Sequence, residues 1–510
     1  MEPLEEMAEI LPNVSASSIE KQKLSWWAFW SVFLTYFAGG FQYGYSIGSV
    51  NAAAVPIQTA LQDYHMMRHN QTMTENQLQV KWVSILACFP VGGIIGSFFV
   101  NQLRKFEYRK TLAILHSATV LASILLALTY AGKAFELLIV GRLIIGFVTA
   151  TAGTGIAPLY MVEVSPRHLR GILGALFSLS ISTGNLLANI FGLEQLLGNN
   201  SLWPVLLFFT CVPSLLLLTF CYFMAPGPRS LYFAEQNQSA TETLLKRLRK
   251  TDDVSEELQD LRDEYAKRDA EERVTIKQIL TSPNLRNQVW GTSFVTVGHM
   301  ITGINAVQIY MGQLFVLSGV ESSLIPYFTI AAAFVLAATN CIGAKLAVKI
   351  ASRYLLIFGY LVEAISLVLL TVTATTQHLA TWISYISIVS AMCFNFGFAI
   401  GPGANTLTLV SESFPQSARS AAQSLACFLF WLCFTLVIVV WPYLQDAIGG
   451  YSYLVFATLA FLFAAHVYVA IPVTKHRTFL EIDESYKSLK LPCHRLRRRS
   501  RASELTNIPV

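Results

Sequence analysis

Twelve apolar stretches run along this chain, and each is long enough to cross a bilayer whose hydrocarbon core is ~30 Å thick. Hydrophobic residues make up 54% of the 510 residues and charged residues only 13%, about half the usual charged share of a soluble protein. The bilayer offers no water to bond the backbone, so such stretches span it as α-helices. The sequence therefore predicts an all-α membrane protein with twelve transmembrane helices, at approximately 25–47, 81–103, 111–131, 135–161, 171–193, 203–224, 287–316, 324–347, 353–373, 380–410, 420–441 and 451–472.

A charged segment separates the sixth apolar stretch from the seventh. Its sequence includes LLKRLRKTDDVSEELQDLRDEYAKRDAEERVTIKQIL, where apolar residues recur at helical spacing among mixed charges. This pattern predicts short amphipathic helices at the membrane surface and two six-helix halves on either side. The expected parts are an N-terminal segment, a first bundle, a helical linker, a second bundle and a basic tail, at 1–24, 25–224, 225–286, 287–473 and 474–510.

Lysine and arginine gather in the short loops on one side of the predicted membrane region and in the linker. Because such residues mark the cytoplasmic side, both termini are expected in the cytoplasm. The plasma membrane is the expected compartment, although the charge pattern does not specify it. The loop 48–80 then lies outside and contains Asn70-Gln-Thr72, an acceptor motif for glycosylation. A second outside motif, at Asn199, lies close to the bilayer.

Several function classes find no support in the sequence. It contains no nucleotide-binding loop, no metal-ligand cluster and no arrangement of a nucleophile with a base, so we expect neither an enzyme nor a cofactor or metal. The net charge of +5 is small and fits a basic cytoplasmic face rather than nucleic-acid binding. The lipid bilayer is the expected partner. Nothing in the sequence indicates an oligomeric state.

The stretch Phe135–Gly192 is the most specific in the chain. It contains GRLIIGF, APLYMVEVSPRHLRG and GNLLANIFG, in which two apolar segments flank a short charged turn. These motifs resemble the sugar porters of the major facilitator superfamily, and in particular the animal facilitative glucose transporters, over roughly residues 25–482. The resemblance implies two pseudo-symmetric six-helix halves that carry a solute by alternating access. It makes a hexose the first expected solute.

Position 46 bears on ion coupling. Many proton symporters of the family read GYDTG in the first helix, whereas this chain reads Gly44-Tyr-Ser46. A serine hydroxyl does not titrate near neutral pH, so the resemblance implies a uniporter. A small residue here would also serve close helix packing, and both interpretations remove the coupling acid.

The family closes its cytoplasmic side with pairs of acids and arginines. The resemblance assigns this gating and charge network to Arg109, Arg142, Glu163, Arg170, Arg353, Glu412 and Arg419. Acids that the family carries are absent at Gly227, Lys349 and Val473. One interpretation is that surface ion pairs contribute little and drift freely. The other is that the gate is weakened, which predicts a resting state open to the cytoplasm.

The family's sugar-binding positions differ most. Ser178 stands where the family has glutamine, His299-Met300 replaces a glutamine pair, Ala399 replaces an acid and Phe430 an asparagine. A helix break at Gly401, Pro402 and Gly403 is retained. The remaining candidates for a solute cavity are Gln42, Ser178, His299, Asn305, Gln308, Asn405 and Trp431.

Alternatives stay open for these residues and for the function. Asn305 could bond a neighbouring helix, His299 could be a packing residue, and Gly401-Pro402-Gly403 bends a helix whether or not a solute binds. His116 and Glu363 are interpreted as structural. Besides a hexose, the solute could be a different organic molecule such as urate or dehydroascorbate. A non-transporting sugar sensor or receptor on the same fold is the alternative from another class.

Overall fold

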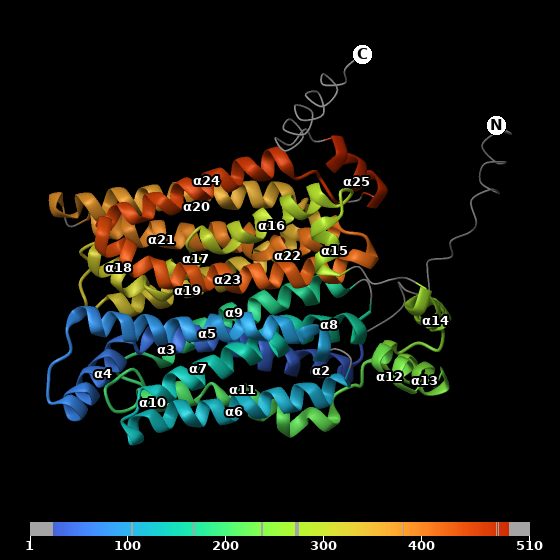
Figure 1. Cartoon of the computed structure of the whole chain (residues 1–510), viewed down its shortest axis with the longest axis horizontal. Coiled ribbons are helices and arrows are strands. Elements are labelled where there is room, and N and C mark those ends of the chain that lie inside the picture. Colours follow the sequence, from blue (N-terminus) through green and yellow to red (C-terminus); the bar gives the residue numbers. More distant parts are fainter. Residues whose placement is uncertain are drawn as a thin grey trace, which may run out of the picture.

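The computed structural model describes residues 24–488 except 104–105, 167–168, 236–237, 271–274, 381, 476 and 478. The described chain forms two helical bundles that lie side by side, with their long axes parallel (Figure 1). Eight stretches of it are long and apolar enough to cross a membrane, and one of them, Ser417–Ala470, holds two helices. Three further helical spans, at 26–52, 170–191 and 286–317, complete the twelve predicted membrane helices, and the all-α class is confirmed.

The N-terminal bundle contains six spans, three of which are interrupted. Two interruptions are π-helical segments, η1 and η2, which contact each other. In order, the spans are α2 (Trp26–Tyr36), η1 (Phe37–Phe41) and α3 (Gln42–Ala52); α5 (Glu75–Leu103); α6 (Tyr108–Gly132); α7 (Glu136–Val148), η2 (Thr149–Ile156) and α8 (Ala157–Val164); α9 (Arg170–Phe191); and α10 (Trp203–Phe208) with α11 (Cys211–Phe220).

The C-terminal bundle repeats this arrangement with breaks in two of its spans. One lies at Gly303, whose φ of 99° is in the left-handed region that glycine adopts without a Cβ clash. The other lies at Gly401. The spans are α16 (Arg286–Ile301), α17 (Ile304–Ile309) and α18 (Met311–Leu317); α19 (Ile325–Lys349); α20 (Ser352–Thr376); α21 (Ile383–Ile400) and α22 (Pro402–Ser413); α23 (Gln416–Ile448); and α24 (Ser452–Ala470).

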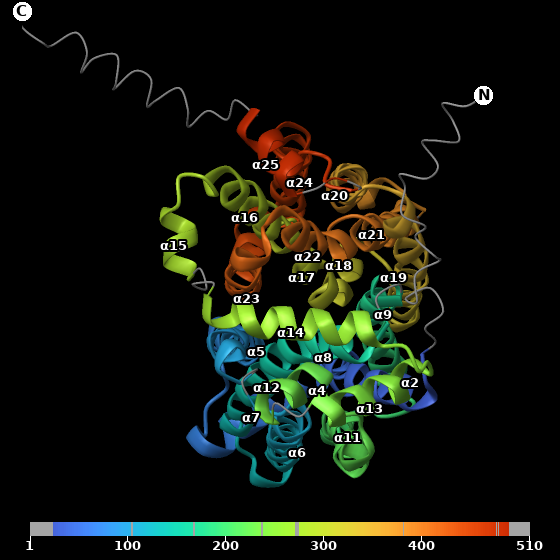
Figure 2. The same cartoon turned by 90° about the vertical axis from the view of Figure 1, so that its right-hand side faces the viewer.

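Short helices cover one end of the molecule, which we call the linker face. Seen from this end, α14 lies at the boundary between the two bundles (Figure 2). The helices are α12 (Pro228–Glu235), α13 (Gln238–Arg249), α14 (Ser255–Ala270), α15 (Ile276–Thr281) and α25 (Phe479–Ser488).

A buried arginine fastens the linker to the N-terminal bundle. Arg249 on α13 forms an ion pair of 3.0 Å with Glu257 on α14, and its side chain is 1% exposed. The same guanidinium donates to the carbonyl of Val164, the last residue of α8, at 2.5 Å. A cation at a helix C-terminus interacts favourably with the helix dipole. At the other end of the linker, Ile279 of α15 is buried against α22 and α23, so the linker contacts both bundles.

The opposite face carries α4 (Ala54–His69), which is held to α7 by an ion pair of 2.6 Å between Arg68 and Glu136. Asn70 follows α4 directly, is exposed and has a left-handed backbone conformation. Asn199 is engaged within its own loop, because its side-chain oxygen accepts from the backbone of Ser201 and Leu202. Asn70 is therefore the better-presented of the two acceptor motifs.

We predict that Asn70 is glycosylated when the protein is made in animal cells. Treatment with an N-glycosidase should shift the wild-type band on a gel, and Asn70→Gln should remove that shift. Asn199→Gln is the matched control and should leave it unchanged. A shift that persists in Asn70→Gln and disappears in Asn199→Gln would contradict the assignment.

Candidate functional site

A cavity of about 1570 Å³ lies between the two bundles. Its inner walls come from α3 and α9 on one side and from α16, α17, α19, α22 and α23 on the other. It extends to the linker face, where Arg229, Arg249, Glu257 and Lys475 line its mouth. The cavity is therefore accessible from the linker face in this conformation.

Aromatic side chains from both bundles close the inner end of the cavity. Trp431 on α23 lies 5.7 Å from Tyr43 on α3 and 5.8 Å from Phe89 on α5, measured between ring centroids. Phe434 stacks on Trp431 at 5.9 Å. Trp431 is 0% exposed, and a Cβ at Gly93 would overlap its indole. Trp431 thus belongs to this aromatic seal and is not a lining residue, although Tyr43 is.

Four of the predicted solute-binding residues line the cavity: Ser178, His299, Asn305 and Gln308. His299 Nδ1 lies 2.8 Å from the Pro402 carbonyl, which can only accept a hydrogen bond. Nδ1 therefore carries a proton, and in the neutral ring Nε2 is left as an acceptor. The Asn305 amide donates to the Met300 sulfur at 3.0 Å.

Two other predicted residues form hydrogen bonds within the bundles and do not line the cavity. Gln42 is 1% exposed and bonds Thr119 and Ser214, both at 3.3 Å, which joins α3 to α6 and α11. Asn405 is 0% exposed, and its amide donates to the carbonyls of Ile400 at 2.7 Å and Gly401 at 3.0 Å. Asn405 therefore stabilises the break between α21 and α22.

That break places groups on the cavity wall. A Cβ at Gly401 would lie 2.6 Å from the Cα of Gly359, so only glycine allows α20 and α21 to approach so closely. Pro402 is the first residue of α22, and its carbonyl orients His299. Gly403 lines the cavity. Ala399, the position of the family's acid, is 0% exposed and faces no solute space.

Sequence reasoning missed a set of polar residues that the structure brings to the cavity. Asn185 and Ser182 of α9 and Asn340 of α19 line it. The signal for α9 is visible in the sequence, because Ser178, Ser182, Asn185 and Asn189 recur at helical spacing in an otherwise apolar segment. For Asn340, whose polar neighbour Thr339 lies on a different side of the helix, no comparable repeat exists.

The match to known proteins is extensive. The family model "Sugar (and other) transporter" matches residues 31–486. This chain belongs to that family of sugar transporters. Mouse solute carrier family 2, facilitated glucose transporter member 5, is 32% identical over 451 residues, or 88% of this chain and 90% of the relative. Mouse member 7 is 32% identical over 449 residues, covering 88% and 87%.

Solved structures support the fold. The proton:xylose symporter XylE bound to 6-bromo-6-deoxy-D-glucose superposes with a TM-score of 0.73 at 20% identity, over 91% of this chain and all of that chain. An inward-open conformation of XylE from E. coli gives 0.72 at 20% identity, covering 90% and 99%. At this level of identity the likeness shows the major facilitator fold of the sugar transporter.

The predicted charge network of the transporter makes contacts within each bundle. In the N-terminal bundle, Arg109 pairs with Glu107 at 2.5 Å, and Tyr108 donates to Glu163 at 2.8 Å. Burial raises the pKa of Glu107, but hydrogen bonds from Lys110 and Arg109 outweigh it and hold the pKa below its ordinary value. Arg142 donates to the Ser46 carbonyl at 2.7 Å, deep in the bundle.

The C-terminal bundle behaves similarly. Arg353 donates to the Tyr468 carbonyl at 2.7 Å, and Glu412 accepts from Thr474 at 2.5 Å. Arg419 donates to the Phe414 carbonyl at 3.5 Å. The side chain of Arg170 lies outside the described part of the chain. Each of these contacts joins groups that belong to the same bundle.

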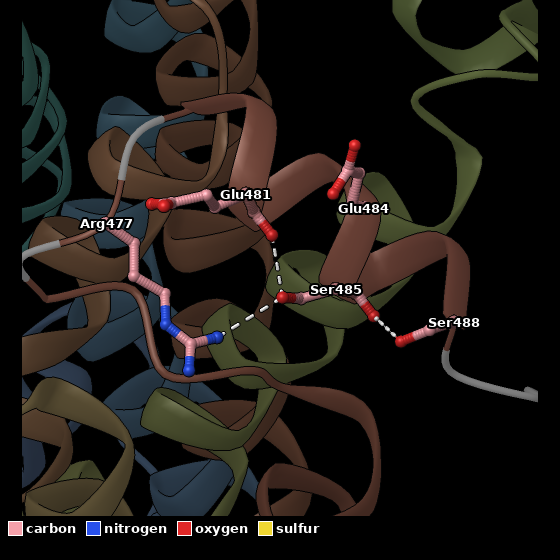
Figure 3. Close-up of a pocket in the computed structure, with 5 residues that line it drawn as sticks. All are labelled: Arg477, Glu481, Glu484, Ser485 and Ser488. Carbon is pink, nitrogen blue, oxygen red and sulfur yellow. Dashed lines mark hydrogen bonds between the residues drawn. The ribbon is translucent and has the colours of Figure 1, made fainter.

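A second hollow of about 640 Å³ lies on α25, away from the cavity. Figure 3 shows that Arg477 points to Ser485, to which it donates at 3.3 Å, while Glu484 points away. This hollow involves a single short helix and the segment before it, so it does not lie on the path between the two bundles.

We predict separate effects for Asn305 and Trp431. Asn305→Ala should weaken solute binding while the thermal unfolding temperature of the purified protein stays near wild type, because it removes a lining amide. Trp431→Ala should lower the unfolding temperature, since deleting a buried tryptophan costs about 3–5 kcal/mol. Trp431→Phe is the control and should retain most stability. Wild-type binding in Asn305→Ala, or wild-type stability in Trp431→Ala, would contradict the respective placement.

We predict that restoring the missing acids moves the transporter away from the conformation open to the linker face. Lys349 is exposed at the end of α19, near Lys475, which donates to the Ala347 carbonyl. Lys349→Glu with Val473→Glu should shift the equilibrium by about 1–2 kcal/mol, roughly tenfold. Labelling of a cysteine introduced at the cavity residue Thr408 should fall accordingly.

Lys349→Gln separates the loss of repulsion from the gain of a new ion pair, and it should give an intermediate labelling rate. If Thr408→Cys is labelled equally in all three backgrounds, the acids have no part in the gate.

Proposed function

We propose that this sugar transporter moves a hexose, or a similar small uncharged polar solute, across the plasma membrane by facilitated uniport. The observation that carries the proposal is the cavity between the two bundles. Amides line its inner part, it opens at the linker face, and aromatic side chains close its inner end. Alternating access requires such a chamber, closed at one end at a time. On this proposal the linker face is cytoplasmic.

The polar groups of the inner cavity suit a neutral solute with several hydroxyls. Asn185, Asn305, Gln308 and Asn340 offer amides that both donate and accept. Among the described lining residues, arginine and lysine occur only towards the linker face, at Arg229, Arg249, Arg419 and Lys475. An anionic solute such as urate would need a cation at the inner end, so the hexose class is favoured over it.

Uniport is supported by the positions of the carboxyl groups in the membrane region. Ser46 stands at the position of the symporters' acid and is 2% exposed. Glu363 on α20 is 0% exposed and is not a lining residue. The carboxyl groups that do line the cavity, Glu163, Glu257, Asp260, Asp263 and Glu412, belong to the linker or to helix segments next to the linker face. Solute and proton therefore share no described carboxyl group at the inner end.

The test is uptake of radiolabelled glucose and fructose into liposomes that contain the purified protein. We expect entry to equilibrium without accumulation, and the same final level with or without an inward proton gradient. Glu363→Gln should behave like wild type in both conditions. Accumulation above equilibrium driven by the gradient would refute uniport.

The remaining alternatives are outcomes of the same assay. Binding of sugars without uptake would indicate a sensor. Uptake of urate or dehydroascorbate, with no uptake or binding of any hexose, would replace the proposed solute class.

A further inference from the structure

A buried carboxyl group lies in the C-terminal bundle, away from the cavity lining. Glu363 on α20 is 0% exposed and does not line the cavity. In the part of the chain that the structure describes, no arginine or lysine donates to either of its oxygens. An unpaired carboxylate is costly to bury in a membrane protein, because the interior cannot replace its hydration. The carboxyl of Glu363 is therefore an uncharged acid, with an O–H donor as well as acceptor sites.

This acid faces the break between α16 and α17. The hydroxyl of Thr302, the residue that caps α16, is buried beside the carboxyl. Among the described residues, this hydroxyl has no other hydrogen-bond partner. Three residues before Glu363, Tyr360 donates to the Val295 carbonyl of α16 at 3.2 Å. Residues three apart share a helix face, so α20 turns both polar side chains towards α16.

The chain direction at Thr302 determines how two cavity residues are presented. Gly303 follows with a left-handed backbone, and its N–H bonds the Met300 carbonyl in place of the regular helical partner at His299. His299 before the break and Asn305 after it both line the cavity. A contact that holds Thr302 in place therefore holds these two side chains in a fixed relation.

The other break in this bundle shows how such a site is stabilised. Between α21 and α22, the buried amide of Asn405 donates to the carbonyls of Ile400 and Gly401. A polar side chain thus satisfies groups that the broken helix leaves unpaired. At the break after α16, Glu363 and Thr302 are buried polar groups available for the same role.

We infer that Glu363 is a permanently protonated acid that donates a hydrogen bond to Thr302 and so positions the break between α16 and α17. It is a positioning residue, because it touches no solute and acts through the cavity residues on either side of the break. Since the acid keeps its proton, it transfers none between the two sides, which agrees with uniport. The bond itself is independent of the proposed function, whereas its effect on uptake rests on that function.

The first measurement is the infrared spectrum of the purified protein, compared with that of Glu363→Gln. Ordinary glutamate side chains have a pKa of about 4.3, so at about pH 8 only a group held in its acid form still shows the carbonyl band of a carboxylic acid. We expect this band in wild type and its loss in Glu363→Gln. If the two spectra agree in this region, Glu363 is ionised and the inference is wrong.

The second measurement is thermal unfolding of Glu363→Leu, Thr302→Val and the double variant. Each single change leaves the other group unpaired inside the bundle and should lower the unfolding temperature. The double variant removes both groups, so it should unfold at no lower a temperature than the less stable single variant. Losses that simply add would show that the two groups do not bond each other.

The third measurement is the initial rate of hexose uptake into liposomes. Glu363→Leu should raise KM about three- to tenfold while the maximal rate stays near wild type. Glu363→Gln keeps a donor and should restore the wild-type KM. The control is Thr371→Val, which removes a buried hydroxyl of α20 that donates to the Leu367 carbonyl of the same helix, and it should leave KM unchanged. A wild-type KM in Glu363→Leu would reduce the acid to a stabilising group and refute its positioning role.

If wild type carries no hexose, the proposed function fails, while the infrared and unfolding measurements still decide whether the bond exists. Should Glu363→Leu not fold, Thr302→Val is compared with Thr302→Ser, which keeps the hydroxyl. KM should then rise in Thr302→Val alone, and an equal KM in both variants would contradict the inference.

Discussion

Polar side chains inside this bundle have almost no water to bond, so each must either bond another protein group or face the cavity. This constraint divides the polar side chains of the membrane region into two groups, those that bond other helices and those that face the cavity. Gln42 bonds two neighbouring helices, and Asn405 bonds the carbonyls freed by a helix break. Hydrogen-bond donor or acceptor sites remain unused on three residues that line the cavity, Asn305, His299 and Gln308. Gln42 and Asn405 therefore have structural roles, whereas Asn305, His299 and Gln308 are placed where a solute can reach them.

The same constraint shapes the contact between the two bundles. At the inner end of the cavity the bundles meet through aromatic rings around Trp431, and no hydrogen bond joins these rings across the bundles. Next to the rings the bundles meet through a hydrogen bond between the amides of Asn185 and Gln308. Parting the aromatic rings breaks no hydrogen bond between the bundles, whereas parting the amides breaks one.

The gating residues complete this picture at the linker face. Arg109, Arg353 and Glu412 each bond a partner within their own bundle, and the cavity is accessible at that face. The linker remains attached through the buried pair of Arg249 and Glu257 and through Ile279. The two ends of the cavity are thus held by different means: aromatic and amide contacts between the bundles at the inner end, and contacts of the linker with each bundle at the linker face.

The sequence by itself determined the twelve spans, the linker and the break at Gly401, because a long apolar run, a charged run and a Gly-Pro-Gly triplet each have one structural outcome. It did not determine which side of a membrane helix faces inward. Lipid is as apolar as a protein core, so hydrophobic periodicity distinguishes the two faces only where polar residues recur on one of them, as they do on α9. Trp431 was therefore predicted on the cavity wall and lies in the seal, while Asn185 was not predicted at all. Its partner Gln308 is 123 residues away, and only the packing of the two bundles decided that they meet.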